Sequence, residues 1–75
     1  MIGHLLMEIA REGAKLSIKY DKEKDDLYFF FSINGEQGRE VLHHSDTELV
    51  NDQNELISHV LIEILSIIRG LKEEM

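Results

Sequence analysis

The sequence predicts one α+β domain in which a helix, a three-stranded antiparallel meander and a long C-terminal helix follow one another, with both helices on one face of the sheet. Three observations predict it. Apolar residues recur at helical spacing near the N-terminus and again after residue 49. Between these segments, apolar and polar side chains alternate and an Asn-Gly turn signal occurs. A chain of 75 residues is long enough for a single domain, residues 1–75.

Residues 2–12 are expected to form a short amphipathic helix. Its apolar positions are Ile2, Leu5, Leu6 and Ile9, and its polar positions are Glu8, Arg11 and Glu12. Gly13 stands where a helix C-cap glycine belongs. A helix of roughly three turns is marginal by itself in water, so it must pack on another element.

The segment "AKLSIKY" alternates as a half-buried strand does. Ala14, Leu16, Ile18 and Tyr20 fall on one face, and Lys15, Ser17 and Lys19 fall on the other. The helices are expected to pack on the face that carries Leu16 and Ile18, together with Phe29 and Phe31 of the next strand. The following "DKEKDD" has no apolar residue and is expected to be a loop between antiparallel strands.

Residues 27–33 are expected to form the central strand, which contains three consecutive phenylalanines. Because side chains alternate along a strand, the helices can cover only one of its faces, which carries Leu27, Phe29, Phe31 and Ile33. Tyr28 and Phe30 are left on the second face, where the stems of Lys15 and Lys19 on the neighbouring strand could cover the rings.

The hairpin "INGEQGREV" allows two registers before a third strand at about residues 39–44. One has a two-residue Asn34-Gly35 turn, and the other a longer loop reaching Gly38. The register decides whether Val41 or Leu42 joins the core face. We favour the longer loop, because Gly38 is a second conformationally permissive position.

The last segment is expected to be a long helix. Ser45 and Glu48 fit a capping box, and Asn51 or Asp52 offers a second cap if the helix restarts there. From residue 49 onward, the apolar residues cover an arc of roughly 160°, wider than the roughly 100° that packing on one surface needs. The width predicts that this helix is covered from more than one direction.

Composition excludes several classes of protein. Without cysteine, disulfides and thiolate zinc sites are excluded. The N-terminal residues do not have the pattern of a signal peptide, and no apolar run is long enough to span a bilayer. We therefore expect a soluble cytoplasmic protein that binds neither a membrane nor a cofactor.

The net charge of −7 is concentrated in residues 36–75, where nine acidic and three basic residues give a balance of −6. Direct binding of nucleic acid needs the opposite sign, so it is not expected. An acidic surface could instead bind a basic surface on a partner protein.

No residue pattern indicates catalysis or a metal site. His43 and His44 are adjacent on a strand and so point to opposite faces, while His59 has only Glu55 and Glu63 at helical spacing. Ser58 and His59 would project about 100° apart on a helix, which is poor geometry for proton abstraction. We expect a protein that is not an enzyme and whose histidines are solvated or partly packed, with weak binding of a divalent ion by the Glu/His cluster on the helix as the open alternative.

Two groups of residues are candidates for binding a partner. The acidic candidates for binding a basic protein surface are Glu36, Glu40, Asp46, Glu48, Asp52 and Glu55. The candidates for self-association are Tyr28, Phe30, Leu42, Ile62 and Leu65.

The layout also resembles a known family. A helix in "GHLLMEIARE", a meander with the loop "FSINGEQGREV" and a helix after "HSDTELVNDQNELISHV" are similar in order and acidity to the small phage-encoded anti-CRISPR proteins that inhibit Cas9. The resemblance implies a stoichiometric inhibitor, encoded by a phage or mobile element, that blocks a nucleic-acid channel. It carries no particular functional residue across.

The predicted function is therefore that of a small acidic, non-catalytic protein-binding module, in the form of an inhibitor that occludes a basic nucleic-acid-binding surface. The alternative is a homo-oligomeric structural or accessory protein, whose partner is a second copy of itself.

Overall fold

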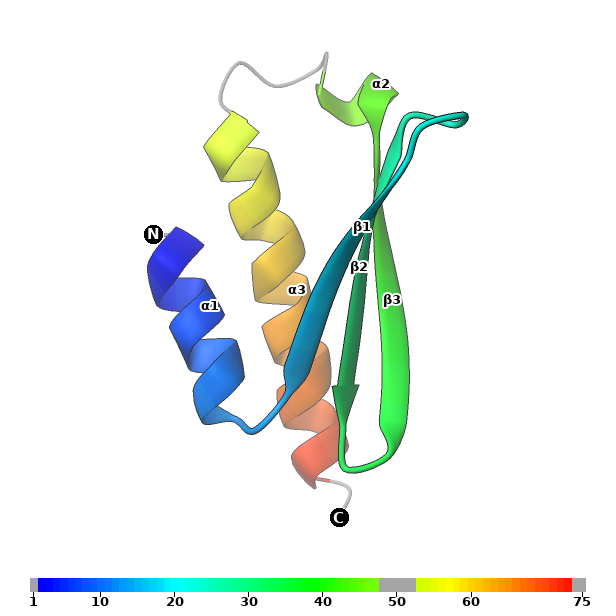
Figure 1. Ribbon diagram of the computed structural model, residues 1–75. Coiled ribbons are helices and arrows are strands. Elements are labelled where there is room, and N and C mark those ends of the chain that lie inside the picture. Colours follow the sequence, from blue (N-terminus) through cyan, green and yellow to red (C-terminus); the bar gives the residue numbers. More distant parts are fainter. Residues whose placement is uncertain (1, 48–52, 74–75) are drawn as a thin grey trace.

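The computed structural model describes residues 2–47 and 53–73 (Figure 1). The elements are α1 (Ile2–Arg11), β1 (Lys15–Asp21), β2 (Asp26–Ile33), β3 (Glu36–His43), α2 (His44–Thr47) and α3 (Gln53–Glu73). The three strands form one antiparallel sheet in the order β1-β2-β3. The predicted α+β layout is confirmed.

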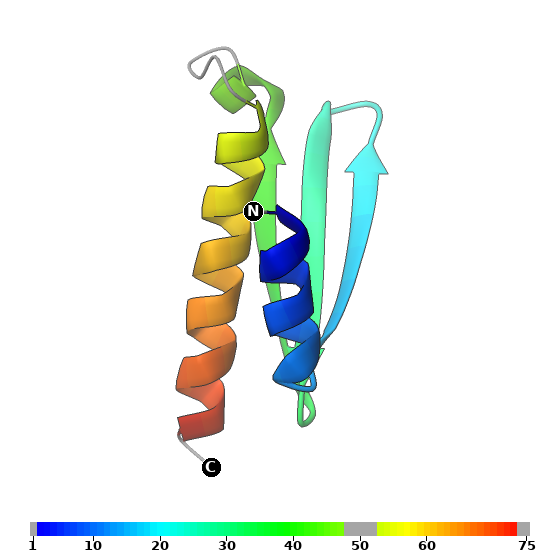
Figure 2. The same cartoon turned by 90° about the vertical axis from the view of Figure 1, so that its left-hand side faces the viewer.

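Helices α1 and α3 lie side by side on one face of the sheet and run in the same direction (Figures 1 and 2). The two helices contact each other, and α3 also contacts β2 and β3. The predicted cover of α3 from more than one direction is therefore found within a single chain. On the other face of the sheet, none of the described helices is present (Figure 1).

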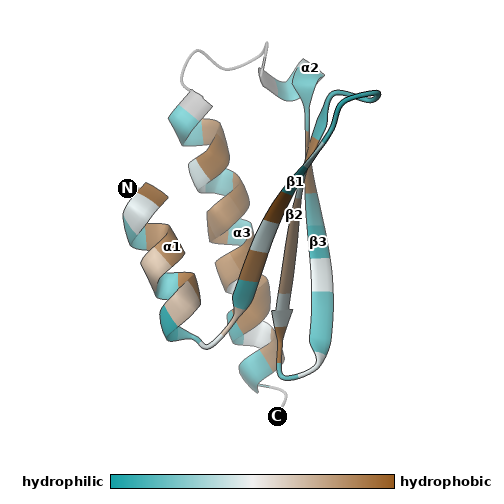
Figure 3. Ribbon diagram, in the orientation of Figure 1, coloured by the Kyte–Doolittle hydropathy of each residue, from teal (hydrophilic) through white to brown (hydrophobic). Residues whose placement is uncertain are grey.

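The core lies between the two helices and the sheet. Its buried members are Leu5, Ile9, Phe29, Phe31, Ile33, Leu42, Leu61, Ile64, Leu65 and Ile68. In Figure 3, apolar residues dominate β2, whereas β3 is largely hydrophilic. The predicted division of β2 is confirmed, because Phe29 and Phe31 are buried while Phe30 between them is exposed.

The β2–β3 hairpin has a two-residue turn, and the prediction of a longer loop reaching Gly38 is wrong. Ile33 pairs with Glu36 across the turn. Asn34 and Gly35 have φ values of 51° and 87°, the left-handed backbone that a type I′ turn needs at both central positions. Asn-Gly satisfies this need without Gly38, so β3 begins directly at Glu36.

Gly38 lies opposite Phe31 on the helix-facing side, and the Phe31 ring covers it. A Cβ atom at residue 38 would lie closer than 3.0 Å to Cζ of Phe31. The glycine therefore provides room for a buried ring in the neighbouring strand. The same register pairs Leu27 with Leu42 and so places Leu42 on the core side.

Strand β1 is the edge strand of the sheet and lies to the side of both helices, which do not stand over it (Figure 2). Leu16, Ile18 and Tyr20 pair with Phe31, Phe29 and Leu27 and so lie on the helix-facing side, as predicted. The expectation that helices pack on Ile18 is wrong, because its side chain is 52% exposed and that of Tyr20 is 59% exposed. The helices stand over the other part of the sheet.

After β3 the described residues form two helices, α2 and α3, and α3 begins at Gln53, next to the site where the sequence allowed the helix to restart. A short helix, α2, begins at His44, and Oδ2 of Asp46 accepts a hydrogen bond from the backbone N–H of His43 at 3.1 Å. The Asp46 side chain, in the first turn of α2, thus reaches back to cap the backbone N–H of the residue that precedes the helix. Glu48 of the expected Ser45–Glu48 capping box, and the alternative caps Asn51 and Asp52, lie outside the described residues. In the described part of the chain, no helix is both long and apolar enough to cross a membrane.

Candidate interaction surface: the open face of the sheet

The face of the sheet opposite the helices, called the open face below, is built by alternate residues of all three strands. These residues are Lys15, Ser17 and Lys19 of β1, Tyr28, Phe30 and Ser32 of β2, and Gln37, Arg39 and Val41 of β3. The register sets Phe30 between Ser17 and Arg39, and Tyr28 between Lys19 and Val41.

Two aromatic rings and two cations form the centre of the open face. The rings of Tyr28 and Phe30 are stacked, with 6.0 Å between their centroids and 18° between their planes. Nζ of Lys19 lies 5.7 Å from the Phe30 centroid, and Cζ of Arg39 lies 5.7 Å from the Tyr28 centroid. Each contact is a cation–π pair of the exposed kind, which contributes about 0.5–1 kcal/mol.

The predicted cover of the rings by lysine is confirmed for Lys19, but sequence reasoning did not find Arg39 as the second cover. The two-residue turn places Arg39 opposite Phe30, within reach of the diagonal neighbour Tyr28. The Asn-Gly dipeptide was the signal that could have located Arg39, because it favours the two-residue turn that sets this register. The longer loop that we favoured gives β3 a different register.

The cations of the open face differ from those on the helices in having no carboxylate partner. On the helix side, Nη2 of Arg69 lies 3.1 Å from Glu8 and Nζ of Lys72 lies 3.6 Å from Glu12, and Arg11 also pairs with Glu8. Within the described chain, no such ion pair is formed by the basic residues of the open face, which are Lys15, Lys19 and Arg39. A protein with a net charge of −7 thus has three cations on one face that form no ion pair with any described residue.

Two carboxylates lie on the same side of the sheet, at the end of the strands farthest from the hairpin, and both have partners. Oδ1 of Asp21 accepts hydrogen bonds from the backbone N–H groups of Glu23 and Lys24. Oδ1 of Asp26 lies 2.8 Å from Nδ1 of His43, its neighbour across the β2–β3 pair. These bonds hold the β1–β2 turn and the end of β3.

The predicted acidic residues do not gather in one place. Glu36 and Glu40 lie on β3 and pair with Ile33 and Phe29, so they are on the helix-facing side of the sheet. Asp46 belongs to α2, beyond the far end of β3, and Glu55 to the first turn of α3. Glu48 and Asp52 lie outside the described residues.

Two of these acids already have partners. Asp46 caps α2 through His43, and Glu55 lies 3.8 Å from His59. Glu36 and Glu40 form no ion pair with any described residue.

The five residues predicted for self-association separate into two groups. Tyr28 and Phe30 lie on the open face, and Ile62 is 49% exposed on α3. Leu42 and Leu65 are buried in the core, so their assignment to an exposed surface is wrong. The two-residue turn turns Leu42 toward the helices, and Leu65 lies in the part of α3 that packs into the core.

The adjacent histidines form two separate pairs, as expected for residues that point apart. His43 pairs with Asp26, and Nδ1 of His44 lies 3.1 Å from Oδ2 of Asp25. The hydroxyl of Tyr20 also donates to Asp25, and this hydrogen bond raises the pKa of Tyr20. Among the described residues, no group of three or more potential ligands is arranged to hold a metal ion.

The stability of the fold is expected to depend on the protonation of His43. The hydrogen bond with Asp26, with the nearby charges of Asp26 and Asp46, raises the pKa of His43 above its ordinary value of 6.5. The stabilisation is complete below pH 6.5 and is lost as the pH rises through the raised pKa. Thermal unfolding should show a larger decrease in Tm from slightly acidic to slightly alkaline pH for the natural chain than for His43→Gln. An equal decrease in both would show that this pair does not contribute.

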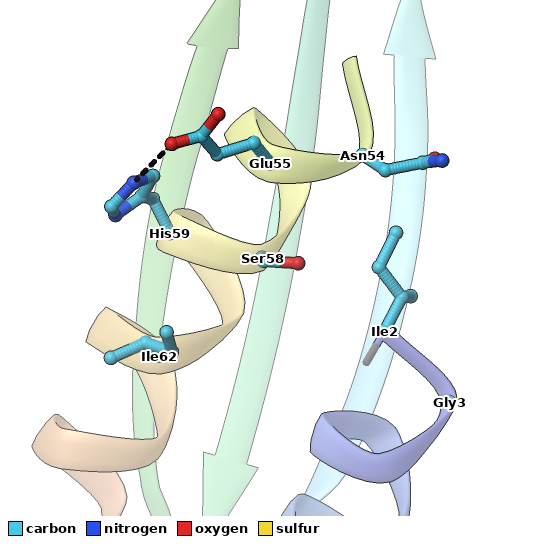
Figure 4. Close-up of a pocket in the computed structure, with 7 residues that line it drawn as sticks. All are labelled: Ile2, Gly3, Asn54, Glu55, Ser58, His59 and Ile62. Atoms are coloured by element: carbon cyan, nitrogen blue, oxygen red, sulfur yellow. Dashed lines mark ion pairs between the residues drawn. The ribbon is translucent and has the colours of Figure 1, made fainter. Parts of the chain in front are cut away.

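A groove of about 650 Å³ lies between the N-terminal turns of α1 and α3 (Figure 4). It is lined by Ile2, Gly3, Asn54, Glu55, Ser58, His59 and Ile62. Ser58 and His59 point apart in Figure 4, and His59 pairs with Glu55 instead. Among the described lining residues, Ser58 and His59 are therefore not in the contact that a nucleophile and its base would make.

The fold and the surface define a small α+β domain with one open sheet face that is both aromatic and cationic. Compared with protein-family models, with curated proteins and with solved structures, the chain gives no match. The similarity to anti-CRISPR proteins accordingly stays a prediction.

Proposed function

We propose that this protein is a non-catalytic protein-binding module that takes an acidic segment of a partner protein on the open face of its sheet. The observation that carries the proposal is the uncompensated charge of Lys15, Lys19 and Arg39 around the stacked rings of Tyr28 and Phe30. Exposed cations beside aromatic rings supply both charge complementarity and apolar contact area, the usual components of a protein interface.

An acidic protein segment suits this surface better than a nucleic acid does. Single-stranded nucleic acids bind sheets by stacking bases on ring faces that are free. Here each ring already stacks on the other and has a cation over it. The net charge of −7 also opposes a long polyanion, whose binding depends on many phosphate contacts.

Self-association through the open face suits it less well. Two copies packed face to face would bring the uncompensated cations of both together, and like charges in an interface are unfavourable. The wide apolar stripe on α3 also needs no second copy to cover it, because α3 contacts both α1 and the sheet.

Substituting Arg39 is expected to weaken the binding of a glutamate-rich peptide. Arg39→Gln removes one of the three exposed cations, so the dissociation constant should rise about two- to fivefold, the effect of one exposed ion pair. Arg11→Gln is the matched control, because Arg11 is also an exposed arginine but lies on α1, where it pairs with Glu8. Titration of the isotope-labelled protein, followed by NMR, should shift the amides of the open face and give affinities for both variants.

Two outcomes of that titration would overturn the proposal. One is an equal loss of affinity for Arg11→Gln, which would mean that charge acts without regard to position. The other is tighter binding of an oligothymidylate than of the peptide, which would assign the face to single-stranded nucleic acid.

A second candidate function, inhibition of a protein by binding its basic nucleic-acid-binding surface, is favoured by Glu36 and Glu40. Both are on the edge strand β3, and neither has an ion-pair partner among the described residues. A lysine-rich peptide in the same titration would shift the amides of β3 around Glu36 and Glu40 if this is the binding edge. Its binding should weaken in Glu36→Gln/Glu40→Gln and as salt is added.

A further inference from the structure

Strand β1 is an edge strand with an apolar, uncovered side. One side of β1 pairs with β2, and its other side is the edge of the sheet, beyond both helices (Figure 2). The exposed Ile18 and Tyr20 lie on the helix-facing side next to the buried Phe29 and the partly buried Leu27. An open edge beside exposed apolar side chains is a template for pairing with another strand.

The hairpin fixes which backbone groups of β1 are available at this edge. In a two-residue turn, the flanking residues Ile33 and Glu36 form a hydrogen-bonded pair, and such pairs alternate along antiparallel strands. The even-numbered residues of β2 therefore bond toward β1, where they pair with Lys15, Ser17 and Lys19. The N–H and C=O groups of the remaining residues, Leu16, Ile18 and Tyr20, point outward. These are the same residues whose side chains lie on the helix-facing side.

We infer that β1 pairs with β1 of a second copy, antiparallel and about a two-fold axis at Ile18, to form a continuous six-stranded sheet. Ile18 then lies opposite the partner's Ile18, and Leu16 lies opposite the partner's Tyr20. All outward backbone groups of the three residues are bonded in this arrangement. The helices of both copies lie on one side, and the exposed apolar residues of β1 meet at the centre.

The charged residues of β1 favour the axis at Ile18 over an axis at either neighbouring residue, Ser17 or Lys19. With the axis at Ile18, Lys15 lies opposite the partner's Asp21, and symmetry makes this pair twice. Asp21 uses Oδ1 for the backbone of the turn, so Oδ2 is available for the lysine. Moving the axis to Ser17 puts Lys15 opposite the partner's Lys19, and moving it to Lys19 puts that lysine opposite itself. Both shifts oppose like charges.

The other edge of the sheet does not fit β1. By the same alternation, the outward backbone groups of β3 belong to Gln37, Arg39 and Val41, which lie on the open face. The outward groups of β1 belong to residues of the helix-facing side. Residues directly opposite each other in an antiparallel pair have side chains on the same side of the sheet. In a β1–β3 contact with all helices on one side, each β1 residue with outward N–H and C=O groups would therefore lie opposite a β3 residue whose groups already point toward β2, so no backbone hydrogen bonds form between the two edges. In this orientation β1 can therefore pair with β1 of a second copy but not with β3.

The first test is the mass of the full chain in solution, measured by light scattering over a range of concentrations. The natural chain should form a dimer, and Ile18→Lys should raise the dissociation constant at least about tenfold, because it places two ammonium groups opposite each other at the axis. Ile62→Lys is the matched control, since Ile62 is 49% exposed and lies on α3. Circular dichroism confirms that each variant is folded. A natural chain that is monomeric at all concentrations, or an equal effect of both variants, would overturn the inference.

The second test reports the register. Because the natural chain contains no cysteine, only the introduced thiols can form a disulfide. Ser17 lies opposite the partner's Lys19 in a non-hydrogen-bonded pair, where Cα atoms are about 4.5 Å apart and can be bridged by a disulfide. Oxidation of Ser17→Cys/Lys19→Cys should therefore give a covalent dimer. Ser17→Cys alone should not, because the two introduced thiols would be on Cα atoms about 8 Å apart, beyond the reach of a disulfide. Cross-linking of the single variant with equal yield would overturn the proposed register.

Discussion

Phe29→Ala is expected to remove a large part of the stability of the protein. The Phe29 side chain is 1% exposed and lies between the sheet and the helices. Truncating a buried phenylalanine to alanine lowers the free energy of unfolding by about 3–5 kcal/mol, through lost burial and the cavity left behind. A domain of this size has a total stability of only about 4–11 kcal/mol. Urea denaturation followed by circular dichroism measures the loss.

The neighbouring Phe30 is the matched control. It differs from Phe29 only in facing the other side of the sheet, where it is 36% exposed. Phe30→Ala removes one ring stack and one cation–π contact, so it should cost about 0.5–1.5 kcal/mol. Similar losses for the two variants would contradict the assignment of the two rings to different faces.

Gly38→Ala is expected to destabilise the fold by about 1–3 kcal/mol, although alanine is usually the better residue in a strand. The added Cβ would lie closer than 3.0 Å to Cζ of Phe31, and that ring is packed in the core and cannot move freely. Overpacking of this kind forces side chains from their preferred rotamers. Chemical denaturation should show a lower midpoint with an unchanged slope.

Gly70→Ala provides the contrast for this prediction. Gly70 lies in α3, and a Cβ there would meet nothing within 4 Å. The substitution should raise the free energy of unfolding by up to about 1 kcal/mol, because alanine has the higher helix propensity. If Gly38→Ala were equally stabilising, the ring of Phe31 would have to occupy another position.

The faces of the strands were predictable because burial imposes a period of two that local sequence displays. Phe29 and Phe31 had to share a side, and Tyr28 and Phe30 had to share the other. Alternation alone does not give the hairpin register; the signal for it is the Asn-Gly dipeptide, which favours the two-residue type I′ turn. The register that results is compatible with the large ring of Phe31, because Gly38 opposite it has no side chain.

The exposure of Ile18 depended on information that β1 does not contain. Alternation places Ile18 on the helix-facing side, but it cannot tell over which strands the helices stand. For the binding surface, alternation was enough to find Tyr28, Phe30 and Lys19. Finding Arg39 required the correct hairpin register. Judging whether the acidic residues form one surface required the three-dimensional structure, because Glu36 and Asp46 are close in sequence but lie at opposite ends of β3.

The contact between α1 and α3 also has a consequence for the order in which the protein folds. The two helices are separated in sequence by the entire meander, yet each supplies part of the cover for the other and for Phe29. A meander that forms first leaves its apolar side in water until both helices have arrived. Bringing α1 and α3 together closes a long loop of chain, and the entropy is lost before the packing of the helices can compensate for it. Non-local contacts of this kind therefore slow folding. A nascent chain would therefore present the side of β2 that carries Phe29 and Phe31 to other molecules until α3 has been synthesised, which makes this interval the time of greatest risk of aggregation.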